Sequence, residues 1–309
     1  MLKKISMALL VSGFCIAQLQ AAGVGAQSAS WMRIPVDVRS SAMAGSLSAA
    51  VDDADALNIN PAGLALMRGT SLSFSHSFWA QDLSLEHAAF GYSTNGVGLA
   101  ASGNYLDFGA IDQFSVGSSG LVSDGTFTPQ ALDFSFGGAL KMGNGIYLGV
   151  AANWTGQNLS NSWDSAISGN LGILYRNEGG FSAAAALLNA GQTLENYSLP
   201  LQVSAGAAFS SPLSRFSPDL TDHSVTIAGQ WDYLPNSSFS SFSIGGEYWY
   251  RQFLAVRAGY RFSDYGTTDG LHGLTLGAGA RLSNFELSYA LVTLGSLGNS
   301  NQLSVSFNL

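Results

Sequence analysis

The sequence contains little charge and almost no cysteine. Only 10% of its 309 residues are Asp, Glu, Lys or Arg, far below the roughly 25% of an ordinary soluble domain. Its one cysteine, Cys15, lies in an apolar stretch near the N-terminus, so the rest of the chain has no thiol for a disulfide, a nucleophile or a zinc site. The formal net charge of −8 argues against nucleic acid as a partner.

Long apolar runs are also missing. After the first twenty residues, no run approaches the roughly 20 apolar residues of a membrane helix. The chain is nevertheless 47% hydrophobic and contains 37 glycines. A β-barrel membrane protein reconciles these features, because its strands cross the membrane with alternating apolar and small or polar residues.

The N-terminus has the pattern of a secretory signal peptide. Lys3 and Lys4 precede an apolar core over residues 5–17 and then a run of small residues. We assign the signal peptide to residues 1–22, and the small residues allow cleavage as late as residue 26. A membrane anchor is the alternative, but the core is short for one and no stop-transfer flank follows.

From Thr70 onward the chain alternates with a period of two, which is typical of strands. In "SLSFSHSFW", Leu72, Phe74 and Phe78 share one face, and the serines share the other. A soluble β-sandwich would alternate in the same way, so this pattern alone does not choose between them. The predicted strands are fourteen: 70–79, 84–93, 97–106, 130–141, 145–155, 164–175, 180–189, 200–210, 223–233, 240–250, 254–262, 271–282, 285–292 and 301–309.

Loop lengths favour an outer-membrane barrel, in which periplasmic turns are short and external loops are longer. The turns predicted to be periplasmic are short: 94–96, 142–144, 176–179, 251–253 and 283–284. The connections predicted to be external are mostly long: 107–129, 156–163, 190–199, 263–270 and 292–300. One periplasmic connection, 211–222, is longer than the rule predicts.

Charged residues within the strands fall on the face predicted to line the lumen. An Arg or Lys on the lipid face costs roughly 2–4 kcal/mol at the bilayer midplane. The short turns place Glu247 opposite Arg257 and Arg281 opposite Glu286, near the periplasmic end of the lumen. These two ion pairs either brace the wall or form a selective constriction.

The two ends of the mature chain each carry a recognisable segment. Residues 23–69 form an N-terminal plug-like segment ahead of the barrel, residues 70–309, because the interior of so wide a barrel must be filled or left wet. In this segment Asp55 precedes a short helix, and Pro61 and Gly63 suit a turn. The C-terminal "QLSVSFNL" resembles the signal that the barrel-assembly machinery reads.

The stretch "DVRSSAMAGSLSAAVDDADALNINPAGLA" resembles the N-terminal signature of the PorV/PorQ family, a branch of the FadL-like outer-membrane barrels. The similarity continues in "LLNAG", "SLPLQVSAGAAF" and "GGEYWYRQFLAVRAGYRFSD". One departure is Ala44, where those relatives usually carry Gly. The resemblance implies an all-β, transmembrane antiparallel barrel of about 14 strands, with the N-terminal segment in or under the lumen. The matched motif residues, with a structural role, are Asn60, Pro61, Ala62 and Gly63.

The resemblance leaves two functions open, both in the outer membrane of a Gram-negative bacterium. FadL-like members transport small hydrophobic molecules, whereas PorV-type members are accessory or shuttle factors of type IX protein secretion. The implied partners are outer-membrane lipid, the assembly machinery, and either a hydrophobic ligand or a secreted protein.

The sequence does not indicate an enzyme, a cofactor or a metal site. The four histidines, His76, His87, His223 and His272, are interpreted as interfacial or loop residues. They show neither the nucleophile–base–orienter arrangement of a hydrolase nor metal-ligand spacing. Glycine runs such as "GAGAR" lie within predicted strands without a following helix, which excludes a phosphate loop.

Overall fold

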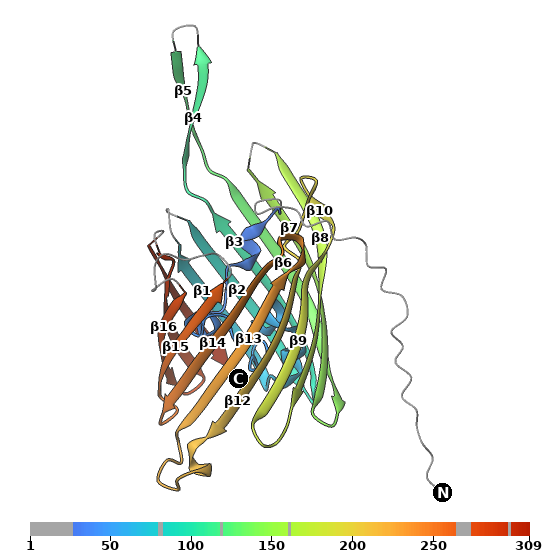
Figure 1. Ribbon diagram of the computed structural model, residues 1–309, viewed down its shortest axis with the longest axis vertical. Coiled ribbons are helices and arrows are strands. Elements are labelled where there is room, and N and C mark those ends of the chain that lie inside the picture. The colour runs from blue at the N-terminus through green and yellow to red at the C-terminus, as the bar shows by residue number, and fades with distance from the viewer. Residues whose placement is uncertain (1–26, 80–82, 118–119, 160–161, 264–272, 296–297) are drawn as a thin grey trace, which may run out of the picture.

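A single antiparallel sheet closes on itself around a wide lumen (Figure 1). The structure, a computed structural model, describes residues 27–309 except 80–82, 118–119, 160–161, 264–272 and 296–297. The predicted signal peptide and His272 therefore lie outside the described residues, as does most of the predicted connection 263–270. Each barrel strand pairs with the next one along the chain, and the first pairs with the last, so that the sheet has no open edge.

The predicted fold class is confirmed, since the closed barrel contains fourteen antiparallel strands. They are β1 (Gly69–Phe78), β2 (Ser84–Thr94), β3 (Val97–Asp107), β6 (Gln130–Gly143), β7 (Ile146–Asn158), β8 (Trp163–Arg176), β9 (Phe181–Gly191), β12 (Gln202–Pro212), β13 (Ser224–Leu234), β14 (Phe239–Tyr250), β15 (Leu254–Ser263), β16 (Leu274–Leu282), β17 (Phe285–Thr293) and β18 (Asn299–Asn308). The predicted bounds agree with these to within about three residues.

The alternation of side chains separates the two faces of the wall. In β1, Ser71, Ser73 and Ser75 are buried inside the barrel, whereas Phe74 and Phe78 are about half exposed on the outside. The same division runs around the barrel, because successive residues of a strand point to opposite faces. The outer surface is consequently apolar and the inner wall is made of small and polar residues.

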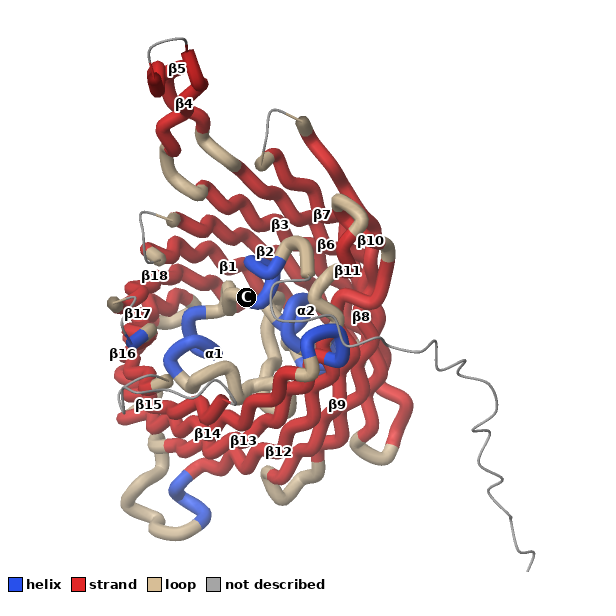
Figure 2. The backbone as a smooth tube through the Cα atoms, turned by 45° about the horizontal axis from the view of Figure 1, so that its top comes forward, coloured by secondary structure: helices blue, strands red, loops and turns tan. Residues whose placement is uncertain are grey.

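The N-terminal segment lies inside the barrel (Figure 2). It contains four short helices: η1 (Ser30–Arg33), α1 (Val38–Ala42), α2 (Ala56–Ile59) and η2 (Pro61–Leu66). Leu57 and Leu64 are fully buried against Ala89 and Ala100 of the wall, within the largest apolar cluster. Among the described residues, no helix is long and apolar enough to cross a membrane.

Small residues in the wall make room for this segment. A Cβ at Gly149 of β7 would overlap the backbone of Pro61 and Ala62. In the segment itself, Ala44 takes the left-handed conformation, with φ 56°, that glycine adopts at less cost. The chain thus makes this turn with an alanine in the left-handed region.

Two hairpins extend from the end of the barrel opposite the short turns. The larger one, β4 (Ile111–Gly117) with β5 (Gly120–Phe127), rises well above the rim (Figure 1). The smaller one pairs β10 (Thr193–Leu194) with β11 (Tyr197–Ser198). The sequence predicts loops at both places, because the external connections are rich in Gly, Ser, Asn and Asp. The remaining short helices are η4 (Leu213–Arg215), in the long connection after β12, and η5 (Pro235–Ser237).

We expect Gly149→Val to displace the N-terminal segment, because overpacking costs roughly 1–3 kcal/mol and here the opposing atoms are backbone. Limited proteolysis of the barrel in detergent should then cleave within residues 27–68. Gly229→Val is the matched control, since a Cβ there makes only ordinary contacts, with Phe242 at 3.6 Å and with Ser243 O at 3.7 Å. Equal protection of both variants would contradict this account.

Candidate functional site

The NPAG motif attaches the N-terminal segment to the wall. The Asn60 side chain is fully buried and accepts a hydrogen bond from Ala62 N at 3.1 Å, which caps η2. Its amide group donates to Ser48 O at 3.0 Å and to Ile173 O of β8 at 3.3 Å. Pro61 begins η2, where its missing N–H has no cost, and Gly63 packs closely on Val51. These contacts are all structural, as they join the segment to itself and to the barrel.

A chain of charged side chains lines the lumen wall along the neighbouring strands β14 to β17, at the end with the short turns. Arg257 lies at its centre with a fully buried side chain. It donates to Glu247 Oε2 at 2.7 Å, to Glu286 Oε1 at 2.8 Å and to Ser288 Oγ at 2.8 Å. Arg281 binds the other oxygen of Glu286 at 2.7 Å. The two pairs named from the sequence therefore form one connected network.

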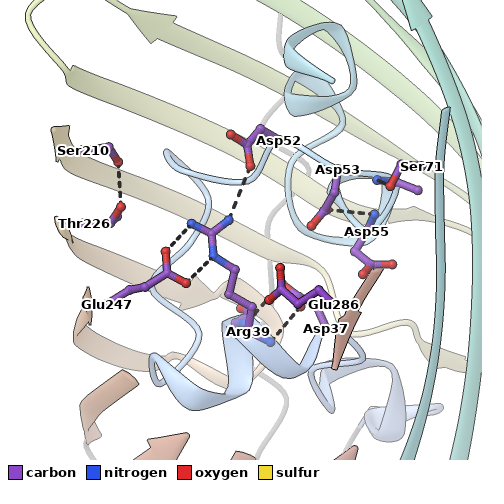
Figure 3. A network of polar contacts seen from close by, with 12 residues as sticks. Asp37, Arg39, Asp52, Asp53, Asp55, Ser71, Ser210, Thr226, Glu247 and Glu286 are labelled. Atoms are coloured by element: carbon purple, nitrogen blue, oxygen red, sulfur yellow. Dashed lines mark hydrogen bonds and ion pairs between the residues drawn. The ribbon is translucent and has the colours of Figure 1, made fainter. Parts of the chain in front are cut away.

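The N-terminal segment contributes a further member, Arg39 of α1, that the sequence analysis did not connect to these pairs. Its guanidinium donates to both carboxylate oxygens of Glu247, at 3.0 and 2.8 Å, and lies 3.4 Å from Asp52 (Figure 3). Glu247 is thus shared between the wall and the segment. The alternating charges bind α1 to β14 and β15, because each buried charge has an opposite neighbour.

A histidine makes a second polar connection between the segment and the wall. His87 of β2 is buried, with Nε2 2.8 Å from Asp55 Oδ1 and Nδ1 2.6 Å from Asn104 Oδ1. Ser73 Oγ donates to the same oxygen of Asp55 at 2.5 Å. Interpreting His87 as an interfacial or loop residue is therefore wrong. Only the fold could show this, since Asp55 and His87 are far apart in sequence.

The arrangement of these three groups differs from that of a nucleophilic triad. In such a triad the histidine lies between the serine and the carboxylate, so that it can accept the serine proton. Here Asp55 lies between Ser73 and His87, and it accepts from the serine. Among the described residues, no group of three or more His, Cys, Asp or Glu is placed to hold a metal ion.

The other described histidines lie elsewhere on the barrel. His76 faces outward and lies 2.5 Å from Glu86 Oε1. The His223 ring, between η4 and β13, shares a 2.7 Å hydrogen bond with the hydroxyl of Tyr248. Neither residue adjoins the charged network.

A polar vestibule of about 1070 Å³ lies beneath the N-terminal segment. Its walls carry Arg39, Asp52, Glu247 and Glu286, together with Lys141 and Arg176. A smaller, mainly apolar pocket of about 260 Å³ lies toward the opposite end of the lumen. Segment residues 33–35 and 44–45 line one side of it, and the ends of β15, β16 and β17 line the other, together with Trp79.

Burial also raises the pKa of Asp37, an acid of the N-terminal segment. Asp37 caps α1, where its carboxylate accepts hydrogen bonds from Arg39 N and Ser40 N at 2.9 and 3.1 Å. Burial and the nearby charge of Asp55 raise the pKa of Asp37 to about 6, although Arg39 and Arg257 oppose this shift. Its ionised form is therefore destabilised in the folded lumen.

Several solved structures share this architecture. The toluene transporter TodX of Pseudomonas putida matches with a TM-score of 0.61 and 14% identity over 86% of this chain and 95% of its own. The toluene transporter TbuX of Ralstonia pickettii matches with a TM-score of 0.57 and 18% identity over 88% and 96%. A FadL homologue of Pseudomonas aeruginosa matches with a TM-score of 0.51 and 11% identity over 88% and 98%. At such identities the likeness shows a shared fold, that of a FadL-like β-barrel.

The chain belongs to the Uncharacterised protein family (UPF0164), whose model matches residues 12–254. This match covers the N-terminal segment and the first ten barrel strands. A comparison with curated proteins found no match.

We expect Glu247→Ala to destabilise the barrel by about 3–5 kcal/mol, because it leaves the buried Arg257 without one of its carboxylates. Arg281→Ala is the control and should cost at most about 1 kcal/mol, since Arg281 is 37% exposed and Glu286 keeps Arg257 as a partner. Denaturant titration in detergent micelles measures both. Equal losses of unfolding free energy in Glu247→Ala and Arg281→Ala would contradict the central role of the Glu247–Arg257 pair.

The raised pKa of Asp37 predicts a pH dependence. Because the folded state binds the Asp37 proton more tightly than the unfolded state, stability falls as pH rises from 3.8 to about 6. Asp37→Asn keeps one hydrogen-bond acceptor but does not titrate. The stability of the native protein relative to this variant should thus fall by roughly 3 kcal/mol between pH 3.5 and 7. Denaturant unfolding of the native protein and of Asp37→Asn at pH 3.5 and at pH 7 tests this. A difference in unfolding free energy that is the same at both pH values would refute it.

Proposed function

We propose that this protein is a non-enzymatic barrel of the bacterial outer membrane that binds and transports small hydrophobic molecules. The observation that carries the proposal is the apolar pocket of about 260 Å³ at the outer end of the lumen. It is smaller than the roughly 300–1,000 Å³ typical of sites for drug-sized ligands, so a small molecule suits it. The fold adds support, since TodX and TbuX, which share it, are described as toluene transporters.

The ligand would bind between the N-terminal segment and the wall. Ile34, Pro35, Val292 and Leu294 supply apolar surface, and Arg261 lies at the edge, where it donates to Ala44 O at 2.9 Å. Beneath this pocket α1 packs on β15 to β18 and is held by the charged network. Passage of a hydrophobic molecule from this pocket through the barrel thus requires the segment to shift. On this proposal, the network stabilises the closed state.

The environment of the barrel follows from its surfaces. The apolar outer face suits outer-membrane lipid, and the C-terminal strand suits the assembly machinery, with Leu303 and Phe307 facing outward. We propose no cofactor and no nucleic-acid partner. The order of Ser73, Asp55 and His87 gives no activated nucleophile, which supports the proposal of a non-enzymatic role.

The second candidate is an accessory or shuttle factor of type IX secretion, as the PorV/PorQ resemblance implies. Two observations favour it. The lumen wall is mostly polar, and the β4–β5 hairpin exposes Phe114, Val116 and Leu121 well outside the barrel. Exposed apolar residues on a protruding hairpin suit a protein partner.

Purification from native membranes, with mass spectrometry of the bound molecules, separates the two candidates. A hydrophobic small molecule should co-purify with the native barrel if it is a transporter. A secreted protein recovered in its place would support the accessory role and overturn our proposal.

Val292→Asp should reduce the co-purified hydrophobic molecule about tenfold or more, because it places a carboxylate in the apolar pocket. Ser210→Asp adds the same charge to the polar vestibule, away from the pocket, and should retain the ligand. Both variants must first show the heat-modifiable migration of a folded barrel. Equal retention by the two variants would place the ligand elsewhere.

A further inference from the structure

Three cavities follow one another through the lumen on the side opposite the apolar pocket. An outer pocket of about 430 Å³ lies next to Phe108 and Tyr197, near both hairpins. A middle cavity of about 110 Å³ lies between the N-terminal segment and β3 to β13. The polar vestibule of about 1070 Å³ opens below. Trp31 lines both the outer pocket and the middle cavity, and Asp37 lines both the middle cavity and the vestibule.

Amides line the barrel side of the middle cavity. Five of them come from the inward faces of five strands: Asn104, Asn153, Asn170, Gln202 and Gln230. Many of these groups bond to one another or to wall carboxylates, as Asn153 does to Asn170 at 3.1 Å. The side formed by the N-terminal segment is more apolar and carries Ile34 and Val36. The amide side can exchange hydrogen bonds with water or a polar solute.

Trp31 lies between the outer pocket and the middle cavity, since it lines both. The side chain is 9% exposed and packs in an apolar cluster with Leu85 and Leu106. Its indole N–H is buried and has no acceptor among the described residues, and the amide nitrogen of Gln27, in the outer pocket, is also buried without one. Buried donors without acceptors are rare, and they are found where water or a ligand supplies the acceptor.

Asp37 lies between the middle cavity and the vestibule, and its charge favours solutes of one sign. Its carboxylate is held in place by Arg39 N and Ser40 N. Asp133 adds a second carboxylate to the middle cavity, where Arg33 is the only cationic lining residue described. A path lined in this way favours cations or uncharged solutes over anions.

We propose that the lumen also conducts small hydrophilic solutes, uncharged or cationic, along this series of cavities, with Trp31 and Asp37 as its two constrictions. This path is separate from the one proposed for hydrophobic molecules. Segment residues 33–35 lie between the middle cavity and the apolar pocket, and they line both. Of the three cavities only the vestibule is lined by the charged network, so on this proposal small solutes pass while the network remains intact.

Planar-bilayer recording of the full-length protein in KCl tests the first constriction. Trp31→Ala should raise the single-channel conductance roughly twofold or more, because it removes the ring from the narrow point, and Trp31→Phe should raise it less. Trp154→Ala, on the outer face of β7, is the matched control and should leave conductance unchanged. Trp31→Ala with native conductance, or no conductance in any of these proteins, would overturn the proposal.

The reversal potential in a KCl gradient tests the second constriction. The native channel should prefer K⁺, and Asp37→Asn should weaken that preference. A preference for Cl⁻ in the native protein would refute the assignment of Asp37. Liposome swelling with arabinose provides a readout with an uncharged solute, and the rate should rise in Trp31→Ala. These measurements do not depend on whether a hydrophobic ligand co-purifies with the barrel. Either proposal can therefore be refuted while the other stands.

Discussion

The closed ring of backbone hydrogen bonds is the constraint on which the rest of this molecule depends. A membrane offers no water to an unpaired N–H or C=O group, so the strands must satisfy one another all the way round. β1 and β18 complete this ring. Once the ring is closed, alternate side chains must point outward and inward. The lipid-facing surface and the lumen therefore arise together from a single pattern.

A barrel of this width creates a lumen that its own wall does not fill. The N-terminal segment occupies that space, and small wall residues such as Gly149 allow its backbone to approach. The segment is held by two kinds of contact. Apolar side chains such as Leu57 pack on wall alanines, while Arg39 and Asp55 make charged and polar bonds to the wall. The polar contacts specify where the segment docks, because a buried charge is tolerated only beside its partner.

The same polar wall gives the lumen two different environments. On one side, the segment and the ends of β15 to β17 enclose an apolar pocket. On the other side, amides and carboxylates line a series of cavities. Residues 33–35 lie between the two environments and line both. They separate a pocket of apolar side chains from cavities lined by hydrogen-bonding groups.

Much of this fold was predictable from local pattern. The period of two located every barrel strand, and short turns paired Glu247 with Arg257 and Arg281 with Glu286. The hairpins beyond the rim were missed, because β4 and β5 pair only with each other and their sequence resembles a loop. The role of His87 was misjudged, since its partner Asp55 lies in a different element.

The sequence by itself determined the strands, their inward and outward faces and the neighbours joined by tight turns, because these depend on residues close together in the chain. Only the tertiary structure decided what fills the lumen. The contacts of Arg39 with Glu247 and of Asn60 with β8 join residues more than a hundred positions apart. Such contacts exist only after the ring has closed and the segment has docked, and no local periodicity encodes them.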